Sequence, residues 1–210
     1  MHCKREARKE ARRQSIIAVA ERSFLEHGYS ATSMSSIAAE LGGSKGTLWG
    51  YFPSKEALFE AVLDGMIGRF AQAMGEALIF GGGTAATLRR FAIVYMEKIT
   101  SPPALALHRL IVAEVDRFPQ LGRIFYERGP KRTRARLAEY MEGEMTEGRL
   151  RRADPAIAAA QFLSLCLSRC YYERLWGLEN LSDRPSVTPE IEAAVDCFMR
   201  AYGPEGCKEG

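Results

Sequence analysis

Apolar residues recur every three to four positions along most of the chain, which is the spacing of α-helices with one buried face. Residues that end or begin helices interrupt this pattern. Gly28 and the pair Gly42-Gly43 follow two apolar runs, while Asp154-Pro155 and Thr188-Pro189 combine a cap with a proline at the first helical position. No Asn-Gly or Asp-Gly turn lies between alternating apolar runs. The sequence therefore predicts an all-α protein of about nine helices.

Composition limits the classes of protein that remain. Of the 210 residues, 47% are hydrophobic, which is enough for a real core and too many for a disordered chain. Five cysteines without paired C-x-x-C spacing argue against a secreted disulfide framework and a zinc site. The charged N-terminus lacks a signal-peptide core, and the stretch from 155 to 168 is too short to span a bilayer. We expect a cytoplasmic protein without metal, cofactor or membrane partner.

The net charge of +3 is unevenly distributed. Residues 1–55 contain nine basic and five acidic side chains, so this segment carries an excess of +4 and the remainder is nearly neutral. A basic end on a neutral body is expected if that end meets a polyanion, although a solvated tail gives the same count. The same alternatives apply to the basic side chains within residues 4–13, which could reach DNA phosphates or form a solubilising tail.

Two short helices joined by a glycine turn are predicted between Thr32 and Phe52, which is the pattern of a helix-turn-helix. The second helix of such a unit enters the major groove of DNA. Its first residues, 44–47, are small and polar, so that the helix can approach DNA closely. Trp49 and Tyr51 can contact sugar or phosphate, whereas Leu48 and Phe52 are interpreted as core. For Trp49 a core position is the alternative.

The run from residue 32 to residue 58 resembles the DNA-binding domain of the TetR family of transcriptional regulators, and the similarity covers roughly residues 10–60. The resemblance implies base-reading or groove-facing positions at Lys45, Gly46, Thr47 and Trp49. It implies phosphate contacts at Thr32, Ser33, Ser44, Tyr51 and Lys55. Trp49 replaces a usual tyrosine and Gly43 a frequent β-branched residue, which leaves the operator sequence open.

Residues 104–130 are similar to the AefR-like subgroup of the same family. The resemblance divides the chain into a DNA-binding domain of three helices at residues 1–55 and a helical effector-binding and dimerisation domain at residues 56–210. It places an effector pocket inside the second domain. The candidates for that pocket are Phe70, Met74, Tyr95, Met96, His108, Phe125, Cys166, Cys170 and Trp176. Ordinary core packing is the alternative for most of them, and oxidant sensing by Cys166 and Cys170 stays open.

A dimer is predicted from the residues themselves. Between 156 and 172 only Gln161 and Arg169 are strongly polar, so this helix is apolar on more than one face. A partner helix can cover the excess, and two helices from each chain would form a four-helix bundle. Burial within one chain is the alternative. The residues assigned to dimerisation are Phe162, Leu163, Leu167, Ile191, Val195, Phe198 and Tyr202.

Together these features predict a dimeric one-component transcriptional regulator of the repressor type. It would bind a palindromic operator in double-stranded DNA and be released by a small, largely apolar effector. A DNA-binding regulator or activator without an effector is the alternative. A helical enzyme is a remote one, because the chain has three histidines and none of the G-x-S-x-G, H-E-x-x-H or phosphate-loop motifs. No catalytic residue is assigned.

Overall fold

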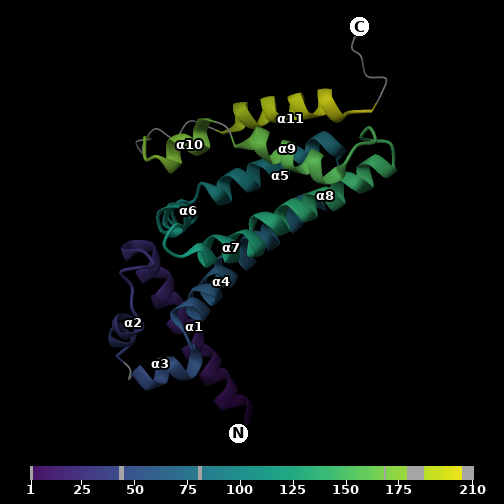
Figure 1. Cartoon of the computed structure of the whole chain (residues 1–210). Coiled ribbons are helices and arrows are strands. Elements are labelled where there is room, and N and C mark those ends of the chain that lie inside the picture. Colours follow the sequence, from purple (N-terminus) through teal and green to yellow (C-terminus); the bar gives the residue numbers. More distant parts are fainter. Residues whose placement is uncertain (1, 43–44, 80–81, 168, 179–186, 205–210) are drawn as a thin grey trace. The chain divides into compact units, whose positions relative to one another are not determined.

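The computed structural model describes residues 2–42, 45–79, 82–167, 169–178 and 187–204. Within these ranges the chain forms eleven helices and no strand, which confirms the all-α prediction (Figure 1). The count exceeds nine partly because two apolar stretches are divided. Gly129 separates the seventh helix from the eighth, and Leu167 ends the ninth helix before the tenth begins at Arg169.

The first of two compact units comprises Met1–Gly68 and Ala106–Arg128. It contains the beginning of α4 (Lys55–Leu78), most of α6 (Pro102–Glu114), and the whole of α1 (His2–His27), α2 (Met34–Glu40), α3 (Lys45–Tyr51) and α7 (Pro119–Arg128). Aromatic rings form the centre of its core. Phe24 lies edge-on to Phe59 with ring centroids 5.3 Å apart, and Tyr29 lies edge-on to Phe118 at 5.1 Å.

The second unit comprises Arg69–Leu105 and Gly129–Gly210. Its complete helices are α5 (Thr84–Ile99), α8 (Pro130–Thr146), α9 (Pro155–Cys166), α10 (Arg169–Leu175) and α11 (Thr188–Tyr202). Helix α9 packs against α8, α11 and α5. Phe162 in α9 is fully buried and lies edge-on to Phe198 of α11, with ring centroids 5.1 Å apart. One hydrophobic core therefore joins α5, α8, α9 and α11, although α6 and α7 lie between α5 and α8 in the sequence.

Local signals explain where the first helices begin and end. Gly28 has a φ of 85°, a left-handed conformation that ends α1, and its N–H donates to Phe24 O at 3.0 Å. Ser33 is the N-cap of α2, since its hydroxyl accepts from Ser36 N at 3.0 Å and Ser33 N donates back to Ser36 Oγ at 3.1 Å. The loop between α1 and α2 is thereby fixed at both ends.

The compact units follow spatial contacts, and they group α6 and α7 with the N-terminal helices. The functional division at residues 1–55 and 56–210 stays a prediction, because compactness does not report which residues bind DNA or an effector.

Candidate nucleic-acid interface

Helices α2 and α3 pack against each other and form the two arms of the predicted helix-turn-helix. Leu48 and Phe52 are buried, at 2% and 4% exposure, and hold α3 against Ile37 and Ala38 of the same core cluster. The interpretation of Leu48 and Phe52 as core is therefore confirmed. Ser44 and the side chain of Lys45 lie outside the described residues.

The outward side of α3 is formed by residues that contribute little to the packing of the chain. Gly46, Thr47, Trp49 and Gly50 are all exposed, and half of the surface of the Trp49 side chain faces solvent. A Cβ added to Gly50 would meet no described atom within 4 Å. Glycine at this position is thus not required by a neighbour inside the chain, and its backbone φ is not in the left-handed region.

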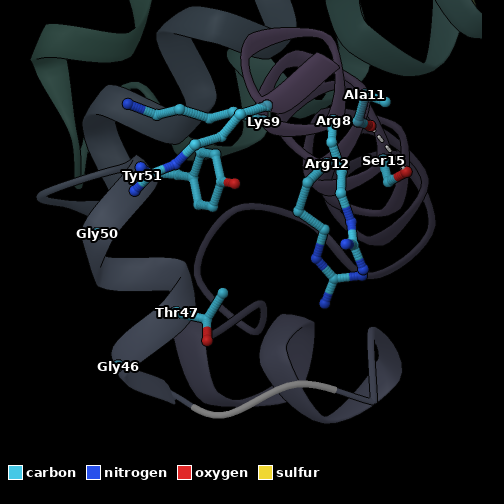
Figure 2. Close-up of a pocket in the computed structure, with 10 residues that line it drawn as sticks. Arg8, Lys9, Ala11, Arg12, Ser15, Gly46, Thr47, Gly50 and Tyr51 are labelled. Carbon is cyan, nitrogen blue, oxygen red and sulfur yellow. Dashed lines mark hydrogen bonds between the residues drawn. The ribbon is translucent and has the colours of Figure 1, made fainter. Parts of the chain in front are cut away.

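An open groove of about 850 Å³ separates α3 from the N-terminal part of α1 (Figure 2). One wall carries Thr47 and Tyr51 of α3, and the opposite wall carries Arg8 and Arg12 of α1. Helix α1 begins at His2, so the basic segment at residues 4–13 is itself helical and forms the N-terminal part of α1. The groove therefore has a regular basic wall.

The residues predicted to contact phosphate in the α1–α2 loop and at the start of α4 differ in how far their side chains are exposed. Ser33 is exposed, whereas Thr32 is buried and its hydroxyl donates to Ser23 O at 3.0 Å and Gly28 O at 2.8 Å. Lys55 is half-buried, with its Nζ 4.3 Å from the centre of the Tyr29 ring and 3.4 Å from Ser30 O. Burial lowers the pKa of Lys55 and raises that of Tyr29.

Two residues at and just beyond the end of α6, Glu114 and Arg117, hold this loop, and neither was predicted from the sequence. Ser30 N donates to Glu114 Oε1 at 2.7 Å, and Arg117 Nη1 donates to Ser30 Oγ at 2.7 Å. In the same unit, Arg128 at the end of α7 links that helix to α4, because its guanidinium donates to Glu60 at 2.9 Å and also to Asp64. A separation of more than eighty residues between Ser30 and Glu114 leaves no local spacing from which the contact could be predicted.

The candidate pocket residues are divided between the two units. Met74, Met96 and Cys166 are buried in the core of the second unit, with Phe70 and Tyr95 packed against it. Cys170 is buried in that unit too, whereas 67% of the Trp176 side chain is exposed. His108 and Phe125 belong to the first unit, where their rings lie 6.4 Å apart and burial lowers the pKa of His108. The candidates therefore belong to both units, and their role in one effector pocket stays a prediction.

Burial also determines the chemistry of the two cysteines. It raises the pKa of the Cys166 thiol to about 12 and that of Cys170 to about 11. At neutral pH both are thiols, and the thiolate is the reactive form. Thiols of this kind are poor oxidant sensors, so the structure favours a packing role for both residues.

The residues assigned to dimerisation lie mostly inside one chain. Six of the seven are buried: Phe162, Leu163, Ile191, Val195, Phe198 and Tyr202. Leu167 is half-buried. These side chains form part of the core of the second unit. The outward sides of the same helices expose other residues, among them Ile157 and Leu165 of α9 and Cys197 of α11.

Within the described residues, no helix is long and apolar enough to cross a membrane, and no group of three or more His, Cys, Asp or Glu side chains could hold a metal ion. Helix α3 and its groove instead combine exposed glycines, hydroxyls and basic side chains beside a helix-turn-helix. This combination defines a helix-turn-helix DNA-binding protein.

Comparison with known proteins specifies the class. Residues 16–62 match the bacterial regulatory proteins of the tetR family, and residues 86–204 match the C-terminal domain of AefR-like transcriptional repressors. The chain therefore belongs to the TetR family of transcriptional regulators and is not an enzyme. The predicted family and subgroup are both confirmed.

Among curated relatives, the HTH-type transcriptional repressor ComR of Escherichia coli K12 is 43% identical over 68 residues, which is 32% of each chain. The regulator YhgD of Bacillus subtilis 168 is 24% identical over 165 residues, covering 75% of this chain and 81% of YhgD. The chain thus matches about a third of ComR but most of YhgD.

Two solved structures are similar over nearly the whole chain. The flavonoid-responsive regulator FrrA is 36% identical to this chain, with a TM-score of 0.79. The match covers 94% of this chain and 100% of FrrA. A TetR-family regulator from Mesorhizobium loti MAFF303099 is 29% identical, with 92% and 98% of the two chains covered and a TM-score of 0.81.

Proposed function

We propose that this regulator binds a palindromic operator as a homodimer through the outward side of α3 and is released by a small effector. The observation that carries the proposal is Gly50, whose missing side chain leaves open space on the exposed side of α3. Glycine within a helix costs about 0.5–1 kcal/mol relative to alanine. The close approach of a DNA backbone or base edge explains why that cost is tolerated at a helix that enters the major groove.

Roles follow from exposure along α3. Lys45, Gly46 and Thr47 occupy its first turn, from which a recognition helix contacts base edges. Trp49, half exposed on the next turn, contacts thymine methyls or sugar, and Tyr51 reaches a phosphate. Ser33, Ser44 and Lys55 add phosphate contacts, while the buried hydroxyl of Thr32 shapes the loop that presents them.

The dimer contact lies on the outward side of α9 and α11. Helix α9 contains no charged residue, and its exposed positions include Ile157, Ser164 and Leu165. Ala193 and Cys197 are exposed along α11. Small and apolar side chains on both helices allow close packing with the same pair from a second chain, as in a four-helix bundle. The inward residues predicted from the sequence support this contact by fixing both helices to the core.

The effector binds in the second compact unit, beside the aromatic group around Tyr95. The Tyr95 ring stacks on Phe91 with centroids 6.0 Å apart and lies edge-on to Phe70 at 6.2 Å. Burial raises the pKa of Tyr95 well above its usual range, so the phenol stays neutral and can donate a hydrogen bond. Aromatic side chains of this kind would pack against a small, largely apolar aromatic effector, and the flavonoid response of the related FrrA makes flavonoids the first class to test.

Release requires that the effector prefer a conformation in which the two α3 helices are wrongly spaced. In the bound state they must reach major grooves about 34–36 Å apart, or multiples of that distance. An effector shifts this equilibrium only by the difference between its affinities for the two conformations. The regulator would act in the cytoplasm, where the operator DNA is located.

Selection from a pool of random duplexes tests the proposal. The expected result is one enriched sequence with two inverted half-sites, whose binding by the protein weakens when a flavonoid or another aromatic effector is added. A single asymmetric site would contradict the dimeric arrangement. An operator whose affinity does not change across a broad panel of ligands would favour a regulator or activator without an effector.

A further inference from the structure

The N-terminal part of α1 carries a basic stripe on one face. Arg5, Arg8 and Arg12 follow one another at three- and four-residue spacing, which places them on the same side of the helix. Lys9 and Ser15 line the same groove. The helix rises about 10 Å between Arg5 and Arg12, a length that spans neighbouring phosphates of one DNA strand.

These charges are not neutralised within the described chain. Arg5, Arg8 and Lys9 are exposed, and none forms an ion pair with a described residue. The neighbouring carboxylate of Glu10 is occupied elsewhere, because it accepts from Gln14 Nε2 at 2.7 Å and lies 3.8 Å from Arg13. Arg12 differs from the other three, since its Nη2 donates to Leu41 O at 3.4 Å and helps to hold α1 against the end of α2.

The stripe faces the recognition helix across the groove. Figure 2 shows Arg8 and Arg12 on one side of the open space and Thr47 and Tyr51 on the other. The rest of the α3 wall is formed by Gly46 and Gly50, which project no side chain into the groove. The lining therefore combines guanidinium and ammonium groups with hydroxyls, the donors that proteins direct at phosphate oxygens.

We infer that the groove between α1 and α3 holds the phosphodiester backbone of bound DNA, so that the basic segment of α1 is part of the DNA interface. The inference rests on the proposed position of α3 in the major groove. A helix in that position has a phosphate strand along each flank, and a basic wall beside it meets phosphates. Contacts of this kind add affinity for every sequence and no discrimination among sequences.

The test is the double substitution Arg5→Gln with Arg8→Gln in the full-length protein. Glutamine keeps the helix propensity and removes only the charge. We expect weaker binding of the selected operator and of an unrelated duplex by a similar factor. The slope of log K against log salt should fall in magnitude by about one for each arginine that contacts a phosphate. Because the unrelated duplex is measured alongside, the result does not depend on whether α3 reads the operator as proposed.

The matched control is Arg132→Gln with Arg152→Gln, which removes the same charge from exposed positions of the second unit. It should leave the salt slope unchanged. An unchanged slope in the Arg5 and Arg8 variant would overturn the inference, as would a loss confined to the operator, which would indicate base reading. Inorganic phosphate supplies the remaining comparison. Saturable binding of free phosphate that requires Arg5 and Arg8, without any effect on DNA, would assign the groove to a small anion instead.

Discussion

Helices α3 and α9 differ in how their residues are used within the folded chain. In α9, Phe162 and Cys166 are almost completely buried, and the helix has no charged residue. In α3, two of seven residues are glycine and half of the Trp49 side chain faces solvent. The composition of α9 is explained largely by the core, whereas the two glycines of α3 lower its helix propensity, and at Gly50 no neighbour within 4 Å in the described chain accounts for the choice. Residue choices of the second kind indicate a functional surface.

The largest expected effect tests the core role of α9. Phe162→Ala removes a ring that is fully buried between Phe91 and Phe198. We expect the free energy of unfolding to fall by about 3–5 kcal/mol, because a cavity remains where the ring was. Denaturant unfolding at one fixed protein concentration measures the change. A loss below about 1 kcal/mol would mean that the ring is not part of a close-packed core.

A smaller effect is expected on the outward side of the same helix. Ile157 is 54% exposed in one chain, and Ile157→Glu places a carboxylate where the proposed dimer contact lies. We expect the dimer to dissociate about tenfold to a hundredfold more readily, equivalent to roughly 1.4–3 kcal/mol. Analytical ultracentrifugation over a concentration series measures the dissociation.

The control for that substitution is Ile79→Glu, at an isoleucine that is 84% exposed just beyond α4. It should leave the dimer intact. Equal effects of the two variants, or no effect at Ile157, would place the dimer contact elsewhere. Helix α9 would then serve the core alone, and its difference from α3 would be larger than proposed.

The fold was largely predictable because its signals are local. The left-handed Gly28, the cap at Ser33 and the Asp154 carboxylate, which accepts from Ala156 N at 2.8 Å, each act within a few residues. Periodicity also identified Leu48 and Phe52 as core correctly. Such signals depend on backbone geometry that any helical chain must satisfy.

Other features could not be predicted because they depend on distant partners. Nothing near Ser30 indicates that Glu114 and Arg117 hold it. The apolar residues of α9 and α11 were also ambiguous, since periodicity shows that a helix has an apolar face but not which chain covers it. Phe162 and Phe198 are covered by their own chain.

The central claim is that the exposed side of α3 binds DNA, and Gly50→Ala tests it most directly. Since a Cβ at Gly50 meets open space, alanine should raise the free energy of unfolding by up to about 1 kcal/mol through higher helix propensity. The same methyl group would stand between α3 and the DNA. Thermal unfolding and operator binding are measured on the same preparation. The account predicts a more stable protein with lower operator affinity; equal or higher affinity in the stabilised variant would contradict it.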